Sequence, residues 1–190
     1  MRKIVSKEIE EKKRKRFMLI IGGILVGIMI LSTVGYAFNR ENSGEEKKIT
    51  YRGIEFTQQN DYWFATIGGA QFAFKYNPQE TEEISSFMTI GINNYAGKAL
   101  YVSSDNLEGE SELYRNLDSI VLRRQYACLK NETCKNKEYP VKTCQDNFII
   151  IKEANISSIS QQENCVFIEG SKNDTIKLVD KFLYKTLGLQ

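Results

Sequence analysis

The chain has 190 residues, a formal net charge of +2 and no histidine. Without an imidazole, Ser-His-Asp and Cys-His catalytic arrangements and histidine metal sites are excluded. Residues 1–16 carry eight basic and three acidic side chains, a local charge of +5, so the remainder carries −3. That balance argues against a nucleic-acid partner.

Residues 17–38 form an uncharged apolar run. At a rise of ~1.5 Å per residue, a helix of this length spans the ~30 Å hydrocarbon core of a bilayer and would contact membrane lipid. The basic segment 1–16 predicts a cytoplasmic N-terminus and an exported remainder. A cleaved signal peptide is the alternative, since Gly35 and Ala37 are spaced like a cleavage site. We favour an uncleaved signal anchor, because signal cores are typically ~7–15 residues long.

Within this run, Gly23 and Gly27 form a small-xxx-small pair. Such pairs let two membrane helices approach closely, so they mark a candidate homodimer face. Glycines are also common in membrane spans without that role. Residues 39–48 are polar and predict a linker, and residues 49–190 have the length of one exported domain with its own core.

Residues 62–76 give the clearest strand pattern, YWFATI-GG-AQFAFKY. Gly68 and Gly69 suit a two-residue hairpin turn, whose positions require positive φ. That turn pairs Trp63 with Phe74 on an apolar face, so Trp63 is predicted to lie in the core. A second tight hairpin is expected over residues 51–56, with Ile54 and Phe56 facing inward.

The remaining predicted elements mix strands and helices. The first is a helix that starts at Asn77 and Pro78 and buries Ile84, Phe87 and Met88, and a strand over 99–103 follows it. A second helix, capped by Ser111 and ending near Cys128, is expected to bury Leu113, Leu117, Ile120 and Val121. Strands over 148–151 and 165–168 come next, and the last element is a helix over 174–187 that ends at Gly188. This order predicts an α+β domain in which antiparallel hairpins pack with helices.

Acidic residues gather in two clusters, Glu80, Glu82 and Glu83, and Glu108, Glu110 and Glu112. We expect both clusters to decorate helix N-termini, where negative charge is favourable. A carboxylate dyad or a Ser–Lys pair would be the basis of a histidine-independent hydrolase. We assign no catalytic, cofactor-binding or metal-binding residue.

Four cysteines lie in the C-terminal half: Cys128, Cys134, Cys144 and Cys165. An oxidising compartment and an even count predict two disulfides. A zinc site would require closely paired cysteines or histidines. Three connectivities are open, and we favour Cys128–Cys134 with Cys144–Cys165, because the first pair closes a short loop.

Asn131, Asn155 and Asn173 head the triplets NET, NIS and NDT, which are N-glycosylation acceptors on an exported chain. The alternative is that all three are unmodified.

The stretches YNPQE (76–80), NCVFIEG (164–170) and DKFLYKTLGL (180–189) resemble a group of uncharacterised archaeal single-pass membrane proteins with an exported α+β domain. The resemblance implies a common fold and an archaeal surface setting. It transfers no activity and no functional residue.

The sequence favours a non-enzymatic module at the cell surface that binds a protein or glycan partner or has a structural role there. A subunit of a larger membrane assembly and the histidine-independent hydrolase are the alternatives. An exposed apolar patch would favour binding or assembly, whereas a deep pocket holding lysine or carboxylates with perturbed pKa would favour an enzyme.

Overall fold

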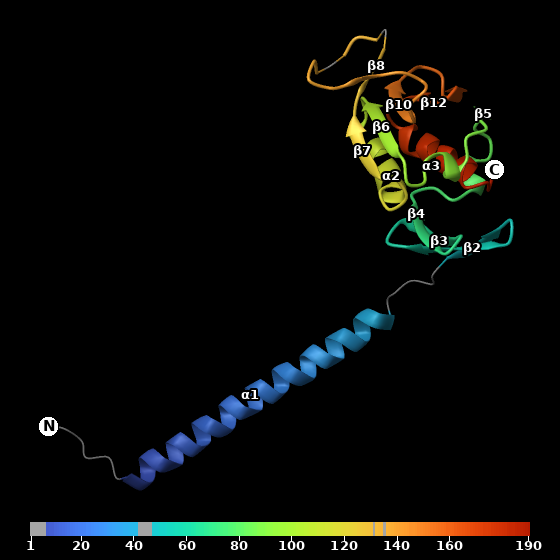
Figure 1. Cartoon of the computed structure of the whole chain (residues 1–190). Coiled ribbons are helices and arrows are strands. Elements are labelled where there is room, and N and C mark those ends of the chain that lie inside the picture. The colour runs from blue at the N-terminus through green and yellow to red at the C-terminus, as the bar shows by residue number, and fades with distance from the viewer. Residues whose placement is uncertain (1–6, 42–46, 131, 135) are drawn as a thin grey trace. The chain divides into compact units, whose positions relative to one another are not determined.

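The structure is a computed structural model that describes residues 7–41, 47–130, 132–134 and 136–190 (Figure 1). The chain divides into two units, Met1–Glu46 and Lys47–Gln190. Each unit is described by itself below.

The first unit contains one long helix, α1 (Lys7–Glu41). Its stretch Arg14–Ser32 is long and apolar enough to cross a membrane, with a mean hydropathy of 1.9. A signal sequence would satisfy the same criterion. Asn39, Arg40 and Glu41, the first residues of the predicted linker, continue the helix. Residues 42–46 of that linker lie outside the described residues, and Lys48 already belongs to the first strand of the second unit.

The second unit starts with a four-stranded antiparallel meander. Its strands are β1 (Lys48–Tyr51), β2 (Ile54–Gln59), β3 (Tyr62–Ile67) and β4 (Ala70–Phe74), in that spatial order. Trp63 pairs with Phe74, as the sequence predicts. Gly68 and Gly69 have φ of 59° and 84°, the left-handed values that a two-residue hairpin turn requires. Both predicted hairpins are therefore confirmed.

A six-stranded mixed sheet follows, and its parallel pairing was not predicted. Its order is β5-β11-β12-β10-β6-β7, with the bounds Ser86–Phe87, Ser158–Gln162, Cys165–Gly170, Phe148–Glu153, Ala99–Ser104 and Arg123–Tyr126. Neighbouring strands from β12 to β7 are parallel, β11 runs antiparallel to β12, and β5 runs parallel to β11. Two short parallel strands, β8 (Cys128–Leu129) and β9 (Val141–Lys142), form a separate ladder.

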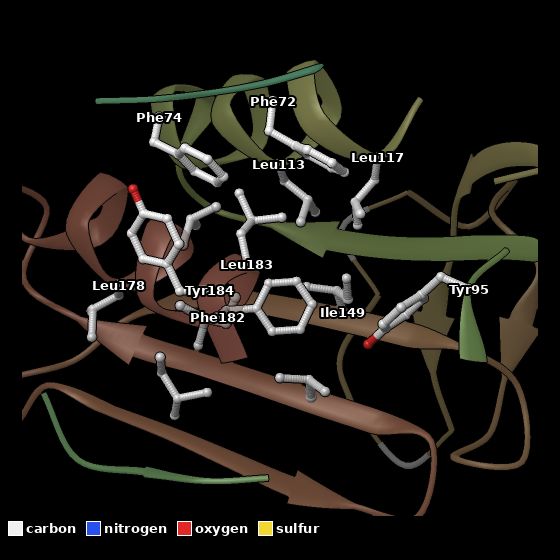
Figure 2. Close-up of a cluster of buried hydrophobic side chains, with 14 of the residues drawn as sticks. Phe72, Phe74, Tyr95, Leu113, Leu117, Ile149, Leu178, Phe182, Leu183 and Tyr184 are labelled. Atoms are coloured by element: carbon white, nitrogen blue, oxygen red, sulfur yellow. The ribbon is translucent and has the colours of Figure 1, made fainter. Parts of the chain in front are cut away.

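Two helices, α2 (Leu107–Leu117) and α3 (Thr175–Thr186), pack against each other and against one face of the six-stranded sheet. Phe72 and Phe74 of β4 meet these helices from the other side, and the Phe74 and Tyr184 rings lie 4.4 Å apart (Figure 2). One apolar core thus joins the meander, the helices and the sheet. The predicted final helix and its stop at Gly188, which has φ of 76°, are confirmed.

The opposite face of the six-stranded sheet has its own small core. Tyr101, Phe148, Ile150 and Cys165 are buried there beneath the segment that includes Ala127 and Leu129. Because both faces of β10 are covered, its residues Phe148–Ile151 are all buried. Such a run is typical of a central parallel strand.

The helix predicted from Asn77 to Met88 is wrong. Asn77 does cap, accepting hydrogen bonds from the main-chain N–H groups of Gln79 and Glu80, but only a single 3-10 turn follows, η1 (Gln79–Thr81). Phe87, expected in the core, is 80% exposed on the edge strand β5. Pairing of Ser86 and Phe87 with β11 replaces helical hydrogen bonds in this segment.

The helix predicted to begin at Ser111 begins earlier. Asn106 is its cap and accepts a 2.8 Å hydrogen bond from the Gly109 N–H. Ser111 lies inside the helix and donates to the Leu107 carbonyl. The helix ends at Leu117 rather than near Cys128, because residues 123–126 pair with β6 as the strand β7.

Candidate functional site

A cavity of about 560 Å³ opens at the carboxyl ends of the adjacent parallel strands β7, β6 and β10. From β6 the chain passes through α2 to β7 on one side, whereas β10 lies on the other side of β6. The strand order therefore diverges between β6 and β10. In open α/β sheets, ligands bind outside the carboxyl ends of the strands at such a switch point.

Each strand and one helix contribute side chains to this cavity, which we call the carboxyl-edge cavity. Its lining residues are Val102, Ser103, Ser104 and Asp105 from β6 and its end, Leu107 and Glu110 from α2, Tyr126 from β7, Lys152 from β10, and Cys128, Leu129, Glu132, Thr133, Cys134, Asn136 and Tyr139 from the segment after β7. The hydrogen bonds between β6 and β10 continue to the cavity, because the Asp105 N–H donates to the Ile151 carbonyl at 3.1 Å. The parallel sheet therefore positions the site.

Glu110 is the buried charged group of the cavity, with 6% of its surface exposed. It lies in the first turn of α2 and accepts a hydrogen bond from the Tyr126 hydroxyl. That hydrogen bond, with partial burial and the negative charge of Glu110, raises the pKa of Tyr126. Burial and the same charge also raise the pKa of Tyr114. Both phenols are therefore neutral hydrogen-bond donors beside the Glu110 carboxylate.

Two tyrosines form an aromatic wall of the cavity. The Tyr126 and Tyr139 rings stack with centroids 5.5 Å apart and an interplanar angle of 17°. Tyr126 comes from β7 and Tyr139 from the loop between β8 and β9, so the stack holds that loop against the sheet. Both tyrosines line the cavity, and the face of a tyrosine ring is negatively polarised.

Lys152 supplies the cavity's one described lysine, and its ammonium is paired with Glu132 at 2.6 Å. The pair joins the loop after β8 to the end of β10. The Ser104 hydroxyl is also hydrogen-bonded, since it donates to the Asn106 carbonyl and accepts from the Asn106 N–H. Neither side chain is arranged as an activated nucleophile with its base.

The cysteines form both of the pairs that the sequence favoured, Cys128–Cys134 and Cys144–Cys165. Cys128 and Cys134 line the carboxyl-edge cavity, so this bridge shapes its rim. The second bridge ties the segment after β9 to the first residue of β12. Among the described residues, no group of three or more histidine, cysteine or acidic side chains is placed to hold a metal ion.

The expectation that Glu108, Glu110 and Glu112 lie at a helix N-terminus is confirmed for Glu108 and Glu110, which stand in the first turn of α2, and is wrong for Glu112. Glu108 is exposed, but Glu110 and Glu112 are buried. Glu112 accepts from the Lys75 N–H at 3.2 Å and pairs with Arg115. The cluster therefore divides among a surface position, the cavity and the core.

Sequence reasoning missed Asp180, a fully buried carboxyl that accepts from the Tyr76 N–H at 2.8 Å. Burial first, and then the charge of nearby Glu112, hold its pKa well above its ordinary range. A signal was present, because Asp180 falls on the apolar face between Ile176 and Leu183 at helical spacing. Asp180 does not line the carboxyl-edge cavity.

The other candidate residues do not join this site. Asn155 is exposed in the turn after β10 and Asn173 in the turn before α3, whereas Asn131 lies outside the described residues. Gly23 and Gly27 lie on α1 with open space where a side chain would stand, since no atom beyond their own stretch of helix lies within 4 Å of that position. Glycosylation and helix dimerisation stay predictions.

Comparison of the chain with protein-family models, with curated proteins and with solved structures finds no match. The resemblance to archaeal membrane proteins therefore stays an expectation, and the functional argument rests on the chain's own residues.

Proposed function

We propose that the protein is a single-pass, membrane-anchored module whose C-terminal domain lies outside the cytoplasm and binds a ligand in the carboxyl-edge cavity. The cavity's place at the switch point of the parallel strands carries this proposal. Side chains from β6, α2, β7 and β10 converge there around a stacked aromatic pair. A few convergent polar groups beside apolar surface are the usual features of a binding pocket.

Two observations support the location. The stretch Arg14–Ser32 is compatible with a signal anchor, and the +5 charge of residues 1–16 favours a cytoplasmic N-terminus. Two disulfides in the C-terminal unit are compatible with an oxidising compartment. Gly23 and Gly27 give the anchor a face on which two copies can pack, and we propose a homodimer contact there.

We prefer binding to hydrolysis because of how the polar groups of the cavity are engaged. The Lys152 ammonium is held by Glu132, and the Ser104 hydroxyl is held by the main chain of Asn106. A Ser–Lys mechanism needs these two kinds of side chain to contact each other instead. The carboxyl with the raised pKa, Asp180, lies in the core.

Protease protection tests the location. Trypsin added to intact cells should remove the domain beyond residue 47 and leave the basic segment 1–16 attached to the membrane fraction. An antibody tag at each end reports the two parts, and cells permeabilised with detergent serve as the control. A C-terminal tag that survives in intact cells contradicts the proposed orientation. A mature N-terminus near Phe38 would show that the anchor is cleaved.

Nuclear magnetic resonance of the full-length ¹⁵N-labelled protein in detergent micelles tests the binding function. The panel contains neutral sugars, organic anions and amines, and the expected result is a saturable shift of amide signals in residues 103–110 and 126–139. Signals of the β1–β2 turn at Arg52 and Gly53, which do not line the cavity, provide the internal control. A panel that leaves the cavity signals unchanged contradicts a ligand-binding role.

A further inference from the structure

We propose that the carboxyl-edge cavity recognises a cationic nitrogen group, an ammonium or a guanidinium. This inference rests on the proposed binding function and names the chemistry of its ligand. It is carried by three features of the cavity: a buried carboxylate, the aromatic wall beside it and the engagement of the described lysine by another carboxylate.

The buried carboxylate is Glu110. Its described hydrogen-bond partners are the neutral hydroxyls of Tyr126 and Tyr114, and within the described part of the chain no Lys or Arg forms an ion pair with it. A charge removed from water is costly unless it is paired. The Lys152 ammonium is paired with Glu132 instead. Arg124 lines a neighbouring hollow together with Glu110, but its guanidinium is paired with Asp118. A cationic ligand would supply a direct countercharge to Glu110.

The aromatic wall lies where that ligand would enter. The Tyr126 hydroxyl donates a hydrogen bond to the Glu110 carboxylate and so holds the Tyr126 ring next to it, and the Tyr139 ring stacks on the Tyr126 ring. A cation within ~6 Å of a tyrosine ring is attracted by the negative face of the ring, more strongly where water is excluded. Carboxylate and rings together therefore favour an organic cation over a neutral molecule.

The start of α2 at the cavity would by itself favour an anion, since helix N-termini attract negative charge. Here the Asn106 side chain already accepts from the Gly109 N–H, and Glu108 and Glu110 stand in the first turn. These carboxylates offset the positive end of the helix. An anion would also meet the Glu110 charge in the cavity.

The cationic group can come from a free amine or from a lysine or arginine side chain of a partner protein. A cavity of about 560 Å³ is large enough for either. Spermidine represents the free amine, and N-acetyl-lysine methylamide represents the protein side chain. N-acetylglucosamine and citrate are the neutral and anionic probes.

The test is titration of the full-length protein in micelles with these four probes, followed by nuclear magnetic resonance of the cavity amides. We expect one or both amines to bind, and citrate and the sugar not to. Glu110→Gln should weaken amine binding by ~10-fold or more, because it removes the charge and keeps the shape. Glu108 is exposed on the same helical turn and does not line the cavity, so Glu108→Gln should leave the affinity for the amines unchanged.

Loss of the native Trp63 fluorescence would reveal that Glu110→Gln is unfolded. In that case a second variant tests the proposal. Tyr139→Leu removes the second ring of the stack and should also weaken amine binding. Sugar or citrate binding without amine binding overturns the cationic ligand and leaves the binding function standing. If none of the four probes and no compound of the wider panel shifts the cavity signals, both the cationic ligand and the binding function are overturned. Binding of N-acetyl-lysine methylamide, which carries a single charge, points to a protein side chain as the source, and binding of spermidine alone points to a free amine.

Discussion

Asn116 of α2 bonds to both main-chain groups of Ala73 on β4: its Nδ2 donates to the Ala73 carbonyl, and the Ala73 N–H donates to its Oδ1, each at 2.9 Å. The side chain thus takes the place of a neighbouring strand at the edge of the meander. Glu112 and Asp180 continue this edge by accepting from the next N–H groups, those of Lys75 and Tyr76. Two helices therefore satisfy an edge that would otherwise be open to another chain.

Asn116→Ala removes both hydrogen bonds and leaves the Ala73 groups without partners at a partly buried position. We expect the free energy of unfolding to fall by about 1–3 kcal/mol. Urea unfolding followed by fluorescence of Trp63, the single tryptophan, measures the change. Asn155→Ala in an exposed turn is the matched control and should change stability by less than ~0.5 kcal/mol. Equal effects of the two variants would contradict the edge role of Asn116.

The raised pKa of Asp180 predicts how stability changes with pH. The folded protein keeps a proton on this buried carboxyl that the unfolded chain loses above its ordinary pKa of 3.8. The folded state therefore binds more protons in this window, and the free energy of unfolding falls as pH rises from about 4 through the raised pKa. We expect a lower urea midpoint at pH 8 than at pH 5.

Asp180→Asn keeps an acceptor for the Tyr76 N–H and an amide that can donate to Glu112, but it cannot ionise. The variant should lose most of the fall between pH 5 and pH 8 and should be more stable than the wild type at pH 8. Asp61→Asn, in an exposed turn, should keep the full fall. A pH profile that Asp180→Asn leaves unchanged would assign the dependence to another group.

Local signals explain which parts of this fold could be predicted. The register of β3 and β4 follows from a glycine turn and a face pattern that lie within 15 consecutive residues, 62–76. The parallel neighbours β6 and β10 pair Tyr101 with Phe148, and no turn between them fixes that register. The run at Phe148–Ile151, buried on both faces, was a usable sign of a parallel strand.

The carboxyl-edge cavity could not be predicted for a related reason. Its side chains come from Val102 to Lys152 and meet only because three parallel strands end together. No spacing between them forms a motif. Glu110 looked like ordinary helix decoration, and only the position of β7, which brings Tyr126 to it, shows that it is buried. The observed disulfide pairing is the one that the sequence favoured among three open connectivities, because one of its pairs closes a short loop.

Trp63 tests the core of the meander. It is 6% exposed and pairs with Phe74, so Trp63→Ala should lower the free energy of unfolding by about 3–5 kcal/mol. Circular dichroism in urea measures the loss, since the variant has no tryptophan to follow. Thr66→Ala, exposed on the same strand, should have little effect. A loss below ~1 kcal/mol for Trp63→Ala would place this side chain outside the core.

The two disulfides should contribute unequally to stability. Cys144–Cys165 closes a separation of 21 residues and Cys128–Cys134 one of 6, so loop entropy predicts losses of about 3 and about 2 kcal/mol when each pair is replaced by alanine. Removal of the short bridge should also weaken ligand binding, because Cys128 and Cys134 line the carboxyl-edge cavity. Removal of the long bridge should leave binding intact wherever the protein stays folded.

Intact mass measures the bridges directly. The full-length protein, purified without reductant, should gain about four mass units on reduction, one hydrogen for each sulfur, and should take up an alkylating reagent only afterwards. The two double-alanine variants are the controls, because each should gain only about two mass units. Four alkylated thiols in the unreduced wild type would contradict both bridges. That result would also remove one of the two observations that support an exported domain, since reduced thiols are typical of the cytoplasm.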